Sequence, residues 1–262
     1  MSVQVLVLTG FGINCDRETG NAFKRAGADV SPMHLNDIAT APEMLKKFHI
    51  LAIPGGFSFG DDIASGKILA NRLRHKLGGP IKQFIADGKL VIGICNGFQV
   101  MVKMGILPLL DNEFIQEVTL TNNNSGRFEN RWITLRGNPD SPCIWTKGID
   151  RIELPVRHGE GKFIPMNNTI LKILHENGQI AFQYCTPDGA IARGEFPFNP
   201  NGAIDDIAGI CDPSGRIFGL MPHPEAFVDR TNHPRWTRES LPEEGAGLQV
   251  FRNAIEYAQA NL

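Results

Sequence analysis

The sequence has little that would tie it to a membrane or to a nucleic acid. Its apolar runs are all shorter than the ~18 residues that a membrane-spanning helix needs, and no basic segment of the signal-peptide type precedes the first of them. The 26 basic and 28 acidic residues leave a formal net charge of -2, which gives no electrostatic footprint for nucleic acid or an anionic membrane. We therefore expect a cytoplasmic protein whose partners are small molecules and other proteins, with no nucleic acid and no membrane among them.

Cysteine is also scarce, and it lacks the spacings that carry known chemistry. The chain has five cysteines, at positions 15, 95, 143, 185 and 211, and no two of them form a CxxC motif. Zinc ribbons need such pairs, and small secreted proteins need an even number of cysteines for their disulfides. We expect no metal site and no disulfide framework, so most of these thiols should be buried in a reducing compartment.

A phosphate-binding loop is missing as well. Gly161-Lys162 is the nearest match, but the pattern G-x-x-x-x-G-K-[ST] fails because Val occupies position 156 and Phe occupies position 163. We therefore expect no bound ATP and no cofactor in this chain.

What the sequence does contain is an alternation of apolar strands and helices. With 42% apolar residues, the chain can bury a full core, and we expect a single domain over residues 1–262. The alternation predicts an α/β fold with an open, mostly parallel, doubly wound sheet and helices on both faces. From about Glu113 the strands are shorter and the turns more frequent, which predicts a smaller antiparallel region laid against the first sheet.

The individual elements can be assigned in the first part of the chain. Strands are predicted over residues 3–10, 49–56 and 89–94, and helices over 16–27, 63–88 and 95–105. The second helix should break at Gly78-Gly79-Pro80, because proline removes a helical hydrogen bond.

A nucleophile elbow is the most informative motif. Gly93-Ile94-Cys95-Asn96-Gly97 ends a buried strand and opens a helix, the same layout as the G-x-S-x-G elbow of hydrolases. Flanking glycines relieve the crowding in such a sharp turn. Its sulfur should stand exposed at the carboxyl edge of the sheet, where α/β folds bind ligands. Cys95 is therefore the predicted nucleophile.

A thiol nucleophile usually needs a base and a group that orients the base. His223 follows an apparent strand in Met-Pro-His-Pro-Glu, where the prolines should keep it extended and put Glu225 on the same side. Cys95, His223 and Glu225 would then form a triad. His158 and Glu160 have the same spacing, so a second His-x-Glu pair remains as an alternative.

Acyl chemistry at Cys95 also needs donors for an oxyanion. The N–H of Asn96 follows the nucleophile directly, and Gly56 ends a neighbouring strand, so we predict these two as the oxyanion hole. Cys15 is a rival nucleophile after the first strand, but it lacks a glycine elbow. We interpret Cys15 as structural or as part of an interface.

Taken together, these motifs resemble the class I (triad) glutamine amidotransferases. The resemblance rests on Gly-x-Cys-Asn-Gly-x-Gln at 93–99, Pro-Gly-Gly at 54–56 and Met-Pro-His-Pro-Glu at 221–225. Within that class, the segments at 12–19, 55–62, 126–132 and 158–163 resemble the glutaminases of the phosphoribosylformylglycinamidine synthases, enzymes of purine biosynthesis. This resemblance covers nearly the whole chain and implies a flavodoxin-like class I amidotransferase architecture.

The resemblance implies a function and further site residues. Cys95 would attack the side-chain amide of L-glutamine and form a thioester, while Gln99, Phe128 and Asn130 would help to bind the substrate. The ammonia would go to an ATP-dependent synthetase partner that converts formylglycinamide ribonucleotide to formylglycinamidine ribonucleotide. ATP and Mg are expected on that partner, and a small accessory subunit is also implied.

Two other classes of function are considered beside this one. A stand-alone flavodoxin-like cysteine hydrolase would keep an elbow cysteine but has no reason to carry Gln99. A non-catalytic interaction subunit would be expected to have a broken triad. In addition, the segment at 232–254 is longer than in compact stand-alone subunits and resembles the end of the fused, single-chain synthase.

Overall fold

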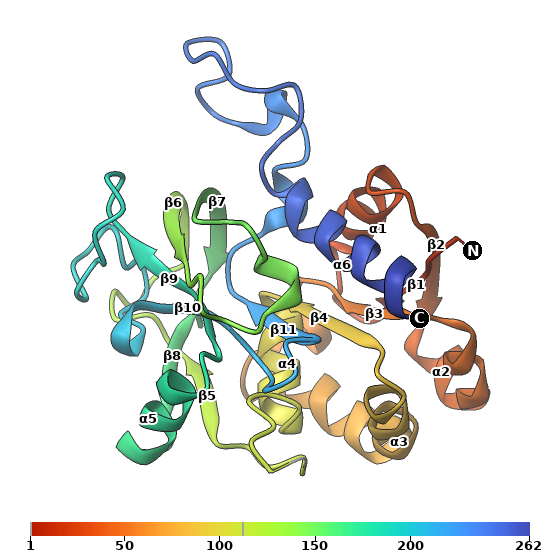
Figure 1. Cartoon of the computed structure of the whole chain (residues 1–262). Coiled ribbons are helices and arrows are strands. Elements are labelled where there is room, and N and C mark those ends of the chain that lie inside the picture. Colours follow the sequence, from red (N-terminus) through yellow and green to blue (C-terminus); the bar gives the residue numbers. More distant parts are fainter. Residues whose placement is uncertain (1, 112) are drawn as a thin grey trace.

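A nine-stranded mixed sheet runs through the computed structural model, which describes residues 2–111 and 113–262 (Figure 1). Its strand order is β2-β1-β3-β4-β11-β10-β9-β6-β7, and a separate two-stranded sheet pairs β5 with β8. The strands are β1 Gln4–Thr9, β2 Asp29–His34, β3 Ile50–Ile53, β4 Leu90–Ile94, β5 Val118–Thr121, β6 Glu129–Gly137, β7 Arg151–His158, β8 Lys162–Pro165, β9 Ile180–Cys185, β10 Ile207–Cys211 and β11 Ile217–Leu220. The α-helices are α1 Asp16–Arg25, α2 Leu35–Thr40, α3 Lys67–Ala86, α4 Asn96–Met104, α5 Asn168–Glu176 and α6 Leu248–Asn261.

One half of the large sheet has the doubly wound arrangement that the sequence predicts. Strands β2, β1, β3, β4 and β11 pair in parallel. Helices α1 and α6 lie on one face of this half, and α3 and α4 lie on the other (Figure 1). The carboxyl ends of β1, β3 and β4 therefore meet at one edge of the sheet, the usual position of a ligand site in this class of fold.

The antiparallel strands are arranged differently from the prediction. We expected antiparallel pairs laid against the first sheet, but β10, β9, β6 and β7 extend the same sheet edge to edge. This is possible because β11 pairs in parallel with β4 on one side and antiparallel with β10 on the other. Of the described strands, β5 and β8 form the separate antiparallel pair.

Helix α3 is continuous, so the predicted break at Gly78-Gly79-Pro80 is wrong. The helix runs from Lys67 to Ala86 with Pro80 inside it. Its buried face includes Leu69, Leu73, Leu77 and Ile81, which recur every four residues and so lie on one side of the helix. Packing of this apolar face against the core outweighs the local cost of proline and glycine.

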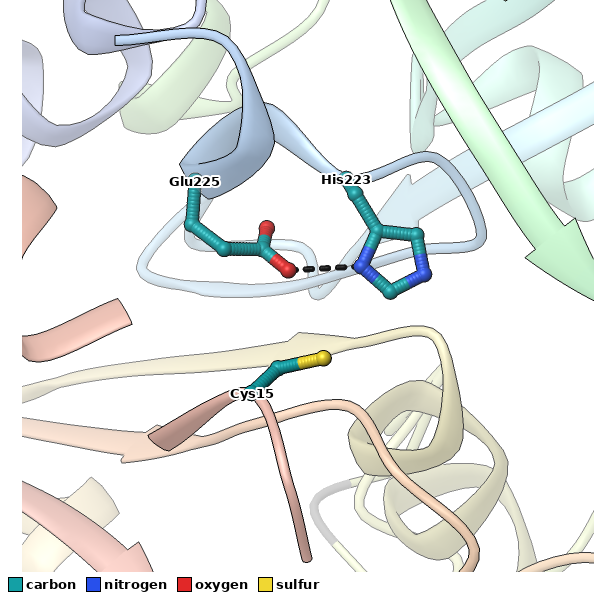
Figure 2. A group of neighbouring side chains, drawn as sticks. All are labelled: Cys15, His223 and Glu225. Carbon is teal, nitrogen blue, oxygen red and sulfur yellow. Dashed lines mark hydrogen bonds and ion pairs between the residues drawn. The ribbon is translucent and has the colours of Figure 1, made fainter. Parts of the chain in front are cut away.

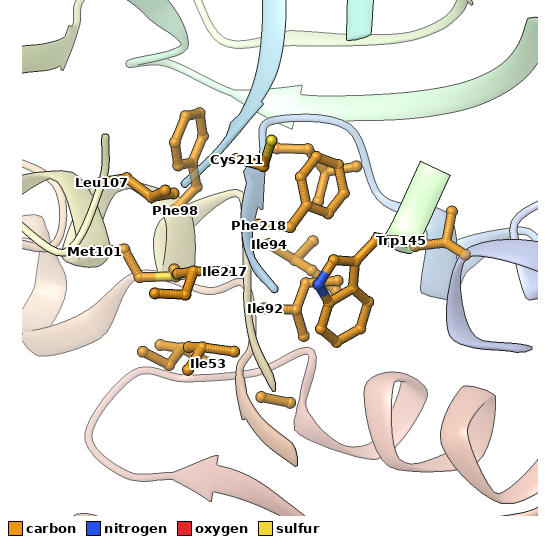
Figure 3. Packing of buried hydrophobic residues seen from close by; sticks show 14 of the residues in the cluster. Ile53, Ile92, Ile94, Phe98, Met101, Leu107, Trp145, Cys211, Ile217 and Phe218 are labelled. Carbon is orange, nitrogen blue, oxygen red and sulfur yellow. The ribbon is translucent and has the colours of Figure 1, made fainter. Parts of the chain in front are cut away.

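The core lies on both faces of the parallel half (Figure 3). Phe98 on α4 packs so closely on β11 that a side chain added at Gly219 would meet its ring at 2.1 Å. Beyond the sheet, the Trp145 ring stacks 6.5 Å from the Phe218 ring, and Phe23 of α1 lies 4.9 Å from Phe251 of α6. These contacts pack α4 against one face of the sheet and hold α1 and α6 together on the other. Among the described helices, none has the length and apolar content needed to cross a membrane.

Residues 229–247 form an arm that projects from the body of the protein between β11 and α6 (blue, top of Figure 1). Its base is closed by a hydrogen bond from the N–H of Arg230 to the carbonyl of Glu243, at 2.9 Å. The buried His233 ring packs 4.7 Å from the Trp132 ring and lies 3.1 Å from the Glu153 carboxylate. Residues 234–240 beyond it are all exposed.

The continuous α3 leads to a prediction about added methyl groups. Gly79→Ala should stabilise the protein by about 1 kcal/mol, because alanine is the better helix former and nothing lies within 4 Å of the added carbon. Gly137→Ala makes the same chemical change in β6, where the added carbon would lie 1.8 Å from the Ile149 carbonyl, and should destabilise by about 1–3 kcal/mol or more. Urea unfolding of both variants measures the difference. A loss of stability in Gly79→Ala would mean that α3 is not continuous in solution.

Candidate active site

The turn between β4 and α4 has the geometry of a nucleophile elbow. Cys95 has φ 51° and ψ -106°, a strained conformation for a residue with a side chain. A side chain at Gly97 would lie 1.8 Å from the Ile53 carbonyl, and one at Gly93 would lie 2.4 Å from the Met101 sulfur. Both glycines are therefore required by close packing, in agreement with the sequence interpretation.

Cys95 is less exposed than we predicted. Only 5% of the residue is accessible, because the β6–β7 hairpin lies over the end of β4. Its thiol donates to the carbonyl of Arg157 in β7, with 3.6 Å between sulfur and oxygen. The residue nevertheless lines a cavity of about 160 Å³, together with Gly56, Phe128, Asn130 and His223 among others. The thiol is thus sheltered from bulk solvent but open to a small molecule.

His223 lines the same cavity, and Glu225 contacts its ring. The Nδ1 atom of His223 is 2.6 Å from Oε1 of Glu225 (Figure 2). The His223 N–H donates to the Pro155 carbonyl at 2.9 Å. We expected an extended strand here, but Glu225 belongs to the 3-10 helix Pro224–Ala226. Proline at the first position of this turn favours it, since its fixed φ angle is compatible with a helix. The two side chains still meet.

The other ring nitrogen of His223 is left without a partner. Nε2 is buried and makes no hydrogen bond within the described part of the chain. Burial would by itself lower the pKa of His223, but the negative charges of Glu225 and of a Cys95 thiolate raise that pKa well above its usual value. A protonated imidazole next to a thiolate is the ion pair that activates a cysteine nucleophile.

The alternative pair, His158 and Glu160, does not form. His158 Nδ1 lies 3.1 Å from the side-chain oxygen of Asn123, and the Glu160 carboxylate accepts from the N–H of Ser65 at 3.3 Å. Burial, with a further contribution from the charge of nearby His223, lowers the pKa of His158 to about 4. His158 is therefore a neutral, buried ring without a carboxylate to orient it.

The predicted oxyanion donors both border the Cys95 turn. Gly56 lines the cavity, and no acceptor for its N–H is found among the described residues. Asn96 is the first residue of α4, so its N–H has no partner within the helix. The Asn96 side chain accepts from the N–H of Ser58 at 3.2 Å and donates to Asp61 at 3.1 Å, which ties the loop after β3 to the elbow. Their role as an oxyanion hole stays a prediction.

The three predicted substrate residues occupy two different places. Phe128 and Asn130 line the cavity, and the Phe128 ring lies 6.1 Å from that of Phe57 at its rim. Gln99 is buried beside it, where its amide nitrogen donates to the Glu160 carbonyl at 2.6 Å and its oxygen accepts from Asn96 at 2.9 Å. Substrate binding by these residues stays a prediction.

The structure places Cys15 beside the candidate triad, and its interpretation as structural or as part of an interface stays a prediction. Its sulfur lies with one nitrogen of His223 and one oxygen of Glu225 in a group whose ligand atoms are all within 4.8 Å of one another (Figure 2). Cys15 also lines the cavity that holds Cys95. A signal was present in the sequence: Cys15 follows β1, whose carboxyl end shares an edge with those of β3 and β4. Requiring a glycine elbow led us to discount it, and nothing in the sequence indicated Arg157.

A larger cavity lies elsewhere and offers no comparable chemistry. It has a volume of about 680 Å³ and lies between residues 138–150 and α6. No histidine lines it. The smaller cavity at Cys95 is therefore the better candidate, because it combines a nucleophile with a base.

Residues 2–258 match the family of CobB/CobQ-like glutamine amidotransferase domains. A protein of Dehalococcoides mccartyi called phosphoribosylformylglycinamidine synthase subunit PurQ is 49% identical over 259 residues, which cover 98% of both chains. A protein of the same name from Treponema denticola is 44% identical over 271 residues, covering 98% of this chain and 99% of the relative. A chain in the solved structure of PurLQS from Thermotoga maritima is similar with a TM-score of 0.72 and 27% identity, over 98% of this chain and 99% of that one. The chain therefore belongs to the CobB/CobQ-like family of glutamine amidotransferases.

Proposed function

We propose that this chain is a glutaminase subunit that hydrolyses L-glutamine to glutamate and ammonia. The observation that carries the proposal is the strained Cys95 turn beside the buried His223–Glu225 pair, with Cys95 and His223 lining one small cavity. A volume of about 160 Å³ suits a single small molecule such as an amino acid. The names of the full-length relatives, subunits of phosphoribosylformylglycinamidine synthase, support the same conclusion.

The proposed reaction uses the triad twice. The Cys95 thiolate attacks the side-chain amide carbon of glutamine, and the carbonyl oxygen takes the negative charge next to the N–H groups of Gly56 and Asn96. Nε2 of His223 gives its proton to the amide nitrogen, the C–N bond breaks and ammonia leaves a thioester. Water then attacks the thioester and returns a proton to His223. The C–S bond breaks, which regenerates the thiolate and releases the product acid, and this acid loses its proton to solvent to become glutamate.

The ammonia is proposed to be used by another protein. The solved chain that resembles this one is part of a PurLQS structure. We extend this to an ATP-dependent synthetase partner, with ATP and Mg on that partner and a small accessory subunit, converting formylglycinamide ribonucleotide to formylglycinamidine ribonucleotide. Exposed apolar side chains at the cavity mouth, Phe57 at 46% and Phe128 at 51%, support docking there.

Further parts of the proposal concern organisation and location. One glutaminase domain over residues 1–262 is supported by a single sheet with strands from Gln4 to Leu220. A cytoplasmic location is supported by five free cysteines. A non-catalytic subunit is disfavoured because the Cys95–His223–Glu225 set is intact, and a stand-alone hydrolase is disfavoured by the names of the relatives.

Removing the nucleophile or the base should abolish hydrolysis. Cys95→Ala and His223→Ala should each lower glutamine turnover by at least about 10³-fold, because members of a triad act as a unit. Cys185→Ala and His175→Ala change the same residue types away from the cavity and should keep most activity. Release of glutamate and ammonia is measured, with circular dichroism to check the fold. Near-native turnover by Cys95→Ala would refute the assignment.

The orienting carboxylate should matter less than the base. Glu225→Gln removes the charge that holds His223 protonated but keeps an acceptor, so a reduced rate should remain, above that of His223→Ala. His158→Ala should be the milder of the two histidine changes in the acylation step, because His158 bonds Asn123 and no carboxylate. If His158→Ala slows acylation more than His223→Ala, the base has been assigned to the wrong histidine.

Hydrolysis should depend on the partner. The isolated chain should turn over glutamine slowly and gain about 10²–10³ in rate when the synthetase, nucleotide and acceptor are added, which is the value of aligning one oxyanion donor. A Cys95→Ala chain serves as control: it should compete for docking without delivering ammonia, while added ammonium salt still supports amination. Full activity of the isolated chain, unchanged by the partner, would contradict the coupling but not the triad.

A further inference from the structure

A second cluster of ligand-type atoms shares His223 and Glu225 with the proposed triad. The sulfur of Cys15, a ring nitrogen of His223 and a carboxylate oxygen of Glu225 all lie within 4.8 Å of one another. The three come from two distant parts of the chain, the start of α1 and the turn after β11. Figure 2 shows the Cys15 sulfur beneath the His223–Glu225 pair. Cys15 is thus a third component that the hydrolysis mechanism does not use.

The donor set has the chemistry of a zinc site. Zn²⁺ is bound by thiolate sulfur, imidazole nitrogen and carboxylate oxygen, and three protein ligands leave its fourth position for water. Bond lengths of about 2.0–2.3 Å place the ligand atoms of such a site about 3–4 Å apart. The ligand atoms of the cluster lie within 4.8 Å of one another, and the hydrogen bond of 2.6 Å between Nδ1 of His223 and Oε1 of Glu225 would open when an ion binds between them. Softer ligands such as thiolate also disfavour Mg²⁺ and Ca²⁺ at this position.

Each of the side chains of His223 and Glu225 also carries one buried polar atom that has no partner. Nε2 of His223 and Oε2 of Glu225 make no hydrogen bond within the described residues. Water does not replace these bonds easily, because both residues are almost fully buried: 2% of His223 and 3% of Glu225 are accessible. The proposed catalysis accounts for the free nitrogen, which would face the substrate, but gives the free carboxylate oxygen no task. Buried acceptors without a partner are costly and usually bind something.

A glycine keeps the space beside these side chains open. A side chain carbon at Gly55 would lie 3.0 Å from the His223 ring, 3.4 Å from the Cys15 sulfur and 3.5 Å from the β-carbon of Cys95. Because Cys15 is only half-buried and lines the cavity, an ion from solvent can reach this space.

We propose that Cys15, His223 and Glu225 form a binding site for Zn²⁺ that switches off the thiol chemistry at Cys95. The ion takes the place of a proton on His223 and competes for the Glu225 carboxylate, so the imidazole can no longer serve Cys95. The inhibitory part rests on the proposed glutaminase function. The binding part rests on the cluster alone.

Binding is tested first without glutamine. Zn²⁺ affinity of the full-length chain is measured by competition with a chromophoric chelator, and Co²⁺ serves as a spectroscopic probe. We expect one ion per chain with a dissociation constant below about 10 μM. The Co²⁺ complex should show intense visible bands of a four-coordinate site and a near-ultraviolet band from sulfur to cobalt. Absence of one-to-one binding in this range overturns the proposal.

Matched cysteine variants identify the ligand. Cys15→Ala should weaken Zn²⁺ binding by at least about tenfold and remove the sulfur-to-cobalt band. Cys95→Ala and Cys143→Ala should keep both the affinity and the band. If Cys95→Ala loses them and Cys15→Ala does not, the ion sits on the nucleophile and the proposed site is wrong.

Inhibition is tested separately, so that the two proposals fail in different ways. Zn²⁺ should inhibit glutamine turnover by the wild-type chain, and a chelator should restore it. Each variant is compared with its own metal-free rate, and Cys15→Ala should need at least about tenfold more Zn²⁺ for half-inhibition. Equal sensitivity of Cys15→Ala and wild type would refute the switch. A chain that never hydrolyses glutamine yet binds Zn²⁺ through Cys15 would refute only the glutaminase.

Discussion

The close approach of α4 to the end of β3 determines where the Cys95 thiol lies. At Gly97 the backbone of the helix passes so near the Ile53 carbonyl that no side chain fits between them. This contact forces the sharp turn at Cys95 and its positive φ angle. It also brings the loop that follows β3, with Gly55 and Gly56, next to the thiol. The nucleophile and its candidate oxyanion donor are thus placed by one packing constraint.

The antiparallel half of the sheet provides the other side of the site. The carbonyl of Pro155 holds the backbone of His223, and the carbonyl of Arg157 accepts from the Cys95 thiol. Both carbonyls belong to β7, and groups two residues apart along a strand point in the same direction. Strand β7 therefore sets the separation between thiol and imidazole. Without these antiparallel strands the thiol would be exposed, and an exposed thiol is what we had expected from the sequence.

Much of the parallel half could be predicted because its strands are short apolar runs that end in glycine turns. The edge strand β2 could not, since Asp29–His34 contains Pro32 and alternates weakly between apolar and polar residues. Strand β7 was missed for a related reason, as Pro155 interrupts its pattern. The break predicted in α3 was wrong because local propensity does not report how much apolar surface a helix buries.

Some residues of the candidate site could likewise be predicted from the sequence, and others could not. Cys95 and the His223–Glu225 pair carry local signals, an elbow between glycines and a histidine between prolines. The structure brings Cys95 and His223 to one cavity, with Glu225 bonded to His223. Cys15 carries only the signal of its place after the first strand and Arg157 carries none, because both are brought to the site by the pairing of strands distant in sequence. Choosing between His158 and His223 as the base likewise needed the bond from His158 to Asn123, which no spacing rule predicts.

The position of α6 does not depend on the projecting arm, residues 229–247, that precedes it in the chain. Helix α6 is held by its own contacts: Asn253 donates to the carbonyls of Trp145 and Lys147, and Phe251 packs on Phe23. The arm leaves the body and returns to nearly the same point, where the N–H of Gly247 donates to the Phe227 carbonyl at 2.9 Å. Beyond the buried His233, residues 234–240 are all exposed, so insertions or deletions there should leave the core and the catalytic cavity unchanged. Residues 234–240 can therefore change in length and sequence while the fold around the thiol stays the same.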